Sequence, residues 1–507
     1  MEGMARKAAF NMLAKSVVTV VTLLSFLYMG KNADPGAVAM LAFALGFVGI
    51  FTFVSDLGFG AAHVKRLSEG GDEAKCNATF LYAKLALTGA MVACVLAAVF
   101  VWDTVNPEGA FNNPEQRWAV YIILIYYALF SLAQVPVVTF SGRMESAKQQ
   151  MPETLGTLAR APLIVYAVMA GLGAVALSLS YVGTGLVMLI VAALLFRSYK
   201  VGHPDRETFK SYSGYATPII LILLILVLSQ NLPPVLIAYF TGSDVEVAGY
   251  FMVQRVTLIF ILVSSSVSPI LFPKLSKDHA CKDIGAMNDT CKASERIISM
   301  YMVPVVAATA ALAPALIHIF LADTYLPMAS ALVLLVAYAF VTSIDMTYVN
   351  VLYGIGRPDI NLRLGIVTVS VTLAGFAILI PRTFFGLTLL GGGATGAAAA
   401  LLLGGCAEYA VSRYYAKKMA GIESYQRIWI HIFAGATMAG ILYGLHAAHL
   451  VDRWYTLAGA SALGLGLYAA ILWAANELRR RDLKFIAEIL NVRKMLSYIS
   501  TELRGKK

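Results

Sequence analysis

Long apolar stretches separated by short polar segments run along nearly the whole chain, from Phe10 to Trp473. About fourteen of them reach the roughly 20 residues that a helix needs to cross a hydrocarbon core of about 30 Å. Met12–Gly30, Ala119–Phe140 and Ile219–Phe240 are examples. The stretches lack the alternation of period two that a membrane β-barrel requires. The pattern therefore predicts an all-α polytopic membrane protein with about fourteen transmembrane helices.

Composition and charge support a membrane protein with a defined orientation. Of the 507 residues, 59% are hydrophobic and only 13% are charged. The net charge of +10 comes from small basic clusters between apolar stretches and not from one basic face, which argues against nucleic-acid binding. Most basic residues fall in every second polar segment, and the predicted outer segments keep only Lys31, Arg117, Arg382 and Arg453. The positive-inside rule then places both termini in the cytoplasm, and we expect a plasma-membrane location.

Two halves of the chain carry similar sequence patterns. The stretch Val64-Lys65-Arg66-Leu67-Ser68 is echoed about 208 residues later by Phe272-Pro273-Lys274-Leu275-Ser276. An even number of spans in each half predicts parallel repeats with a cavity between them. The predicted domains are residues 1–203 with spans 1–6, 204–420 with spans 7–12, 421–476 with spans 13–14, and 477–507 as a cytoplasmic amphipathic tail.

Several short motifs occur in a characteristic order. They are Ser55-Asp56-Leu57-Gly58-Phe59-Gly60, Phe320-Leu321-Ala322-Asp323-Thr324-Tyr325-Leu326-Pro327, Leu352-Tyr353-Gly354-Ile355-Gly356-Arg357-Pro358, and Ile380-Pro381 with Gly396-Ala397-Ala398. Together they resemble the polysaccharide-transporter branch of the multidrug/oligosaccharidyl-lipid/polysaccharide (MOP) exporter superfamily, the lipid-linked oligosaccharide flippases. One stretch departs from the family pattern, because Thr383–Gly396 is longer and richer in glycine than usual.

The resemblance implies two six-helix lobes in a V shape. The predicted thirteenth and fourteenth spans have no counterpart in the first half of the chain and are expected as two extra C-terminal helices. Proteins of this family alternate between inward-open and outward-open states around a cationic cavity. They move a polyprenyl-phosphate- or pyrophosphate-linked oligosaccharide from the cytoplasmic to the outer leaflet, for surface polysaccharide or glycoprotein assembly. The implied partners are the lipid-linked glycan, the bilayer, and a downstream glycan polymerase, ligase or oligosaccharyltransferase. The glycan, the carrier lipid and the oligomeric state stay open.

A buried cation is the direct physical requirement for sheltering a phosphate in a membrane. Arg255 lies within the predicted eighth span, where a charge costs at least about 2.5–3.5 kcal/mol, and arginine suits bidentate phosphate recognition. Its alternative role is a structural pair with Asp345 or an outward reach to Asp244. Gln254 and Lys15 are secondary candidates for the same cavity, although Lys15 could also reach the cytoplasmic surface.

Two further arginines and three other polar residues complete the candidate set. Arg143 and Arg160 flank the predicted fourth and fifth spans, where they could attract an incoming phosphate or act only as topology determinants. Asp56, Asp345 and Asn350 lie within spans and are candidates for Na⁺ or H⁺ coupling, with helix capping or structural pairing as the alternative. The five cysteines form no CxxC pair, so neither a metal site nor another cofactor is expected.

Two other function classes fit the sequence less well. A membrane glycosyltransferase or polymerase would need carboxylates or metal ligands on a sizeable outer loop, and the longest predicted one, near Asp103–Gln116, has no DxD motif or histidine cluster. A drug/cation antiporter of the same superfamily typically buries an acidic residue in its first or seventh helix. Neither predicted span has one here. The sequence thus favours a transporter of an anionic cargo over an enzyme, with the antiporter as the alternative.

Overall fold

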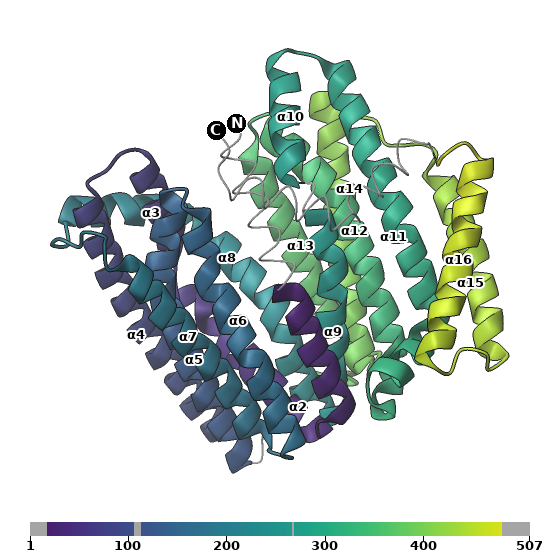
Figure 1. Cartoon of the computed structure of the whole chain (residues 1–507). Coiled ribbons are helices and arrows are strands. Elements are labelled where there is room, and N and C mark those ends of the chain that lie inside the picture. Colours follow the sequence, from purple (N-terminus) through teal and green to yellow (C-terminus); the bar gives the residue numbers. More distant parts are fainter. Residues whose placement is uncertain (1–17, 106–112, 266–267, 479–507) are drawn as a thin grey trace, which may run out of the picture. The chain divides into compact units, whose positions relative to one another are not determined.

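The structure, a computed structural model, describes residues 18–105, 113–265 and 268–478. It consists mainly of long helices (Figure 1). The described residues also include a hairpin of two very short strands. The described residues fall into two compact units that divide between Ala248 and Gly249. The all-α class predicted from the sequence is confirmed. Lys15 and the predicted tail beyond Leu478 lie outside the described residues.

Each unit is a succession of helices. Unit 1 contains helical residues 18–32, α2 (Pro35–Ile50), η1 (Phe51–Ser55), α3 (Phe59–Ser68), α4 (Glu73–Val105), α5 (Pro114–Gly142), α6 (Ser146–Met169), α7 (Ala174–Phe196) and α8 (Arg206–Thr241). Unit 2 contains most of α9 (Asp244–Ser265), then α10 (Ser268–Ala280), α11 (Ile284–Phe320), η3 (Asp323–Met328), α12 (Ala329–Gly354), α13 (Pro358–Leu379), β1 (Thr383–Phe384), β2 (Leu387–Thr388), α14 (Gly393–Ala420), α15 (Ile428–Ala447) and α16 (Trp454–Ala474).

Eleven helical segments among the described residues are long and apolar enough to cross a membrane. They include α4 with 33 residues and α5 with 29. At 1.5 Å per residue, helices of this length exceed the thickness of a hydrocarbon core. The chain is therefore a multi-pass membrane protein.

Capping residues fix where several of these helices begin. The Asp34 carboxylate accepts a hydrogen bond from Ala37 N at 2.9 Å, and Pro35 occupies the first helical position of α2. Asn113 and Pro114 repeat this arrangement at the start of α5. The N-cap side chain accepts a hydrogen bond from one of the backbone N–H groups that have no partner within the helix. The proline that follows has no N–H group to leave unpaired, so these helices start at defined residues.

The core of unit 1 includes a buried histidine that joins three helices. His63 on α3 lies 2.8 Å from the Tyr212 hydroxyl on α8 through Nδ1, and 2.9 Å from the Thr139 hydroxyl on α5 through Nε2. Its ring stacks on Phe80 at 4.3 Å between centroids. Both ring nitrogens are satisfied, which makes His63 a structural link between α3, α5 and α8.

The long glycine-rich stretch between α13 and α14 forms the hairpin. Thr383 pairs with Thr388 and Phe384 with Leu387, in antiparallel register. The two loop residues, Phe385 and Gly386, both have positive φ, at 49° and 79°, as a two-residue I′ turn requires. The additional length of this segment is therefore used in a small ordered hairpin.

The division into units differs from the predicted lobe boundary at residue 203. Helix α8, which starts the second predicted half, packs against α2, α3 and α4 in unit 1. The two matched basic stretches lie in corresponding short helices, α3 and α10, each following a long apolar helix. The duplication and the six-plus-six division remain predictions.

Candidate functional site

The helix that begins with α2 is interrupted before α3. After η1 ends at Ser55, Leu57 and Gly58 adopt left-handed conformations with φ of 46° and 85°, and α3 starts at Phe59. A leucine in this region is strained by about 1–2 kcal/mol. Interrupted backbone at membrane depth is tolerated only where protein surrounds it or where it lines a cavity. The break therefore requires partners for the carbonyl groups it exposes.

Lys84 on α4 supplies such a partner. Its Nζ donates to the Ser55 carbonyl oxygen at 2.8 Å and to Asp56 Oδ1 at 2.8 Å. The lysine side chain is 3% exposed, whereas the Asp56 side chain is 32% exposed. A buried ammonium without a carboxylate would be strongly destabilising, so Asp56 and Lys84 stabilise the break together.

A pocket of about 470 Å³ opens beside this ion pair, within unit 1. Its polar lining residues are Thr52, Ser55, Asp56, Lys84, Tyr127, Ser131, Gln134, Ser141 and Gln149. All lining residues from α5, polar and apolar, lie at positions 127, 130, 131, 134, 137, 138 and 141, which are the three- and four-residue spacings of one helix face. This volume falls in the range of small-ligand pockets, which is about 300–1,000 Å³.

The wall of the pocket between α4 and α5 is itself held by polar contacts. The Thr88 hydroxyl lies 2.8 Å from the Ser131 hydroxyl, one helical turn beyond Lys84 on α4. On the side of η1, Thr52 and Ser55 bond to the backbone oxygens of Gly49 and Thr52. Hydroxyl, amide and carboxylate groups thus face a pocket inside an otherwise apolar helical bundle.

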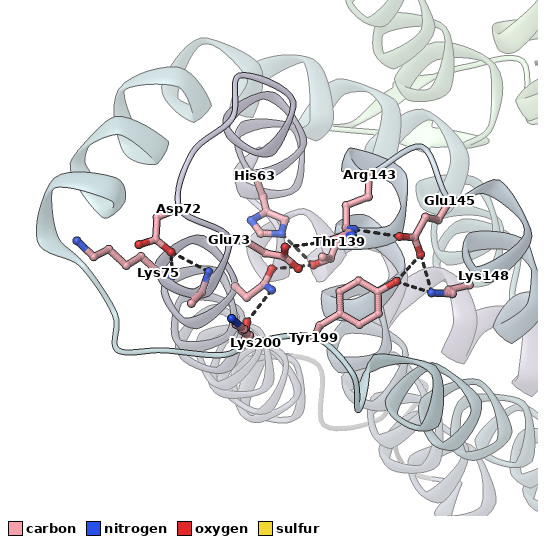
Figure 2. Close-up of polar contacts among 12 residues, drawn as sticks. His63, Asp72, Glu73, Lys75, Thr139, Arg143, Glu145, Lys148, Tyr199 and Lys200 are labelled. Atoms are coloured by element: carbon pink, nitrogen blue, oxygen red, sulfur yellow. Dashed lines mark hydrogen bonds and ion pairs between the residues drawn. The ribbon is translucent and has the colours of Figure 1, made fainter.

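Arg143, a predicted cavity residue, lies in a surface cluster at the end of α5. Its guanidinium contacts Glu73 at 2.5 Å and Glu145 at 2.9 Å (Figure 2). Lys148 also bonds to Glu145, at 2.8 Å, and to the Tyr199 hydroxyl, at 2.6 Å. Tyr199 in turn donates to Glu145. We call these five residues the Arg143 cluster.

The electrostatics of the Arg143 cluster favour an ionised carboxylate. Partial burial by itself raises the pKa of Glu145, but hydrogen bonds from Lys148, Tyr199 and Arg143 outweigh it and lower that pKa to about 2. Arg143 is engaged by two carboxylates and is not among the residues that line the pocket. Arg160 on α6 lies elsewhere in unit 1, with its guanidinium 4.9 Å from the centre of the Tyr181 ring.

The remaining predicted phosphate-binding residues lie in unit 2 or outside the described residues. Arg255 on α9 is partly buried, and its guanidinium lies 4.9 Å from the centre of the Phe251 ring, one turn earlier. Gln254 beside it is also partly buried. Because Arg143 and Arg160 belong to unit 1 and Gln254 and Arg255 to unit 2, a cavity shared by all of them remains a prediction.

The predicted coupling residues of unit 2 lie in a packed polar layer. Asp345 on α12 is 5% exposed and accepts a hydrogen bond from Ser412 on α14. Nearby on α12, Thr347 lies 2.9 Å from the Ser294 hydroxyl and Tyr348 donates to Glu295, both on α11. The Asn350 amide bonds to Met346 O at 2.7 Å. These contacts fit the structural-pairing alternative, while an ion-coupling role stays untested.

The sequence interpretation missed buried charged residues, among them Lys84, Glu295 and Glu477. Lys84 was a recognisable signal, because it is the only charged residue between Lys75 and Asp103 within α4. Glu477, the first residue of the predicted tail, is 2% exposed. It contacts Arg427 at 2.7 Å and Arg296 at 3.5 Å, and accepts from Tyr425. Nothing in its local sequence indicates burial.

Comparison with known proteins gives one family match and several similar structures. The family model described as polysaccharide biosynthesis protein matches residues 32–330, more than half of the chain. No individual curated protein matches the chain. Among solved structures, an inward closed conformation of the lipid II flippase MurJ has a TM-score of 0.74 and 13% identity, covering 93% of this chain and 99% of that one.

Two further solved structures have the same type of fold. An inward-facing multidrug resistance MATE family transporter of the MOP superfamily has a TM-score of 0.66 and 16% identity, with 80% of this chain and 94% of that chain covered. A MOP superfamily transporter from Pyrococcus furiosus, described as having a binding pocket of reverse polarity, has a TM-score of 0.56 and 18% identity, with 82% and 95% covered. At these identities the similarity establishes the fold. Together with the family match, it confirms the resemblance drawn from the motifs: the chain belongs to the polysaccharide biosynthesis protein family and has the fold of MOP superfamily transporters.

Proposed function

We propose that this protein is a flippase that moves a polyprenyl-phosphate- or pyrophosphate-linked oligosaccharide from the cytoplasmic to the outer leaflet by alternating access. The observation that carries the proposal is the polar pocket of about 470 Å³ beside the Lys84–Asp56 pair, inside an apolar helical bundle. A hydrophilic headgroup crosses a hydrocarbon core only if the protein offers it polar surroundings. The polysaccharide biosynthesis family of the chain fits this cargo.

The proposed arrangement has fourteen spans, in two six-helix lobes that form a V plus two C-terminal helices. The eleven candidate spans leave three of the fourteen to be assigned. In this arrangement helical residues 18–32 form the first span, α6 the fifth and α9 the eighth. The concentration of basic residues in alternate polar segments supports cytoplasmic termini. We place the protein in the plasma membrane, where it would deliver cargo to a glycan polymerase, ligase or oligosaccharyltransferase.

Arg255 is the proposed partner of the cargo phosphate. The Phe251 ring beneath its guanidinium supports the planar group by a cation–π contact, and the fork of donors on a guanidinium matches the geometry of phosphate oxygens. In this scheme Gln254 and Lys15 assist Arg255. Arg143 and Arg160 would act earlier, as attractors for the approaching phosphate.

Ion coupling is proposed at Asp345 with Asn350, or at Asp56, using a Na⁺ or H⁺ gradient. The support is that Asp345 is buried in a polar layer between α11, α12 and α14. In vesicles with an imposed gradient, Asp345→Asn should abolish the stimulation of transport by that gradient. Unchanged stimulation by both Na⁺ and H⁺ gradients in Asp345→Asn and Asp56→Asn would remove these residues from coupling.

A drug/cation antiporter is the competing function, and the Lys84–Asp56 pair argues against it. A cationic substrate in the pocket would have to displace an ammonium group that already holds Asp56 at 2.8 Å. The pocket therefore offers a cation no unpaired carboxylate among its described lining residues. This favours a transporter of polar cargo over the antiporter.

Transport measurements on the full chain test the proposal. Vesicles with reconstituted protein should expose labelled polyprenyl-phosphate-linked glycan on the opposite leaflet faster than empty vesicles do. Arg255→Ala should reduce this rate to the background level with unchanged protein content, and Arg255→Lys should recover only part of it, because lysine loses the bidentate geometry. Full activity of Arg255→Ala would remove Arg255 from the mechanism, and no transport by the unmodified protein would overturn the proposed function.

A further inference from the structure

We propose that the pocket beside Lys84 and Asp56 binds neutral sugar residues of the cargo glycan, and that the cargo phosphate binds elsewhere. This inference rests on the proposed function and assigns one part of the cargo to one place in unit 1. It follows from the charge balance of the pocket, from the chemistry of its lining and from its position along the helices.

The charge balance disfavours a phosphate in the pocket. Lys84 is the only basic residue among the described lining residues, and it already donates to Ser55 O and Asp56 Oδ1, each at 2.8 Å. Asp56 compensates its positive charge. A phosphate would have to take Lys84 from both acceptors and then lie beside the Asp56 carboxylate, so electrostatic repulsion would add to the lost hydrogen bonds.

The rest of the lining matches a polyhydroxylated ligand. Gln134 and Gln149 each carry both a donor and an acceptor, which is what a row of sugar hydroxyls requires. Asp56, at 32% exposure, keeps oxygen surface that can accept from two neighbouring hydroxyls. Tyr127 and Phe130 add aromatic surface for the apolar face of a sugar ring. The volume of about 470 Å³ suits a small part of a glycan and not a long chain.

The position of the pocket fits the side from which the cargo is loaded. All its lining residues from α5 lie between Tyr127 and Ser141, in the second half of that helix, and Gln149 lies near the start of α6. The Arg143 cluster marks the same end of unit 1. Under the proposed orientation this end faces the cytoplasm, where the glycan is attached to its carrier before export.

The chain offers a matched pair of variants for the test. Gln149 lines the pocket and its neighbour Gln150 does not, although both are partly buried on α6. We would reconstitute the full-length protein and measure two quantities: the transport of lipid-linked glycan extracted from the source membranes, and the binding of bare polyprenyl phosphate. The variants are Gln149→Leu and Gln134→Leu, with Gln150→Leu as the control.

The pocket variants should impair transport of the glycan-bearing lipid and leave binding of the bare polyprenyl phosphate nearly unchanged. Loss of one or two hydrogen bonds predicts an approximately three- to tenfold lower transport rate for glycan-bearing lipid in Gln149→Leu and Gln134→Leu. Binding of bare polyprenyl phosphate should change less than about twofold, and Gln150→Leu should match the unmodified protein. If either glutamine variant is poorly folded, Tyr127→Leu, which removes the aromatic surface, is compared with Tyr126→Leu, because of these two tyrosines only Tyr127 lines the pocket.

Three outcomes would overturn the inference. Equal losses for glycan transport and for binding of the bare phosphate would indicate that the pocket holds the phosphate or only supports the fold. Unchanged transport in all pocket variants would place the glycan elsewhere. In both cases the proposed function would stand. If the unmodified protein moves no glycan-bearing lipid at all, the proposed function fails and the inference fails with it.

Discussion

The carboxylate of Asp56 lies directly against the backbone of Gly60. A Cβ placed on Gly60 would come 3.0 Å from Asp56 Oδ1, which is tighter than most real contacts, and 3.4 Å from Oδ2. Oδ1 is the oxygen that holds Lys84. The glycine therefore keeps open the space that Asp56 needs in order to face both Lys84 and the pocket.

Gly60→Ala should reduce transport with little loss of stability. Alanine within a helix gains about 1 kcal/mol of propensity over glycine, which offsets part of the steric cost of moving Asp56. We expect a melting temperature within about 2 °C of the unmodified protein and a several-fold lower transport rate. Combining Gly60→Ala with Asp56→Ala is the control, because without the carboxylate the added methyl group should have no further effect. Additive losses in that double variant would contradict this account.

The two members of the Lys84–Asp56 pair should differ in the cost of their removal. Asp56→Ala leaves an almost fully buried ammonium without its carboxylate, which predicts a loss of about 3–5 kcal/mol. Lys84→Met leaves a carboxylate that is one-third exposed and an unsatisfied Ser55 carbonyl, with a smaller expected loss of about 1–3 kcal/mol.

Denaturation of the purified protein would measure this asymmetry. The double variant Lys84→Met with Asp56→Ala should be more stable than Asp56→Ala alone, because no isolated buried charge remains. If Lys84→Met were the more damaging single change, the lysine would have a role that its ion pair does not account for.

The Arg143 cluster predicts a defined pH dependence of stability. A folded-state pKa of about 2 for Glu145 lies below the usual value of about 4.3. The carboxylate therefore contributes stability that is fully present above about pH 4.3 and is lost as the pH falls towards 2. The difference in melting temperature between the unmodified protein and Glu145→Gln should be constant from pH 8 to about pH 5 and shrink below it. A difference that grows on acidification would have the wrong sign.

Glu477 should hold the last two helices to the rest of unit 2. Its carboxylate contacts Arg296 on α11 and Arg427 at the start of α15. Glu477→Ala removes the carboxylate beside the mostly buried Arg296 but keeps the backbone oxygen to which Arg296 donates, and we expect a loss of about 1–3 kcal/mol. Hydrogen exchange should rise in α15 and α16 and remain unchanged in α4 and α5. Glu423→Ala, which removes an exposed contact with Lys292 at 2.7 Å, is the matched control.

The sequence predicted the helical class because runs of about 20 apolar residues have few other structural solutions in a membrane. It also identified Asp56 as unusual. It did not identify Lys84 as its partner, because the two residues are 28 positions apart on different helices and only packing brings them together. The break at Leu57 and Gly58 was equally hidden, since glycine and leucine are both common in membrane helices.

Arg143 shows a different limit of sequence interpretation. The sequence shows a basic residue at the end of a span, but it does not show which carboxylates this residue contacts. Arg143 contacts Glu145, two residues later, and Glu73, which is 70 residues earlier in the chain. Glu477 was assigned to the start of a cytoplasmic amphipathic tail. Its burial depends on Arg296, which is 181 residues earlier in the chain.

The interrupted helix between η1 and α3 has a consequence for how homologous sequences can vary. Lys84 compensates both a carbonyl group and a carboxylate that the interruption leaves inside the bundle. In a relative whose helix runs through this region without interruption, a lysine at the equivalent of position 84 would have neither acceptor and should be replaced by an apolar residue. Lineages that keep the Asp-Leu-Gly turn should keep the lysine, so the two features are expected to be gained and lost together.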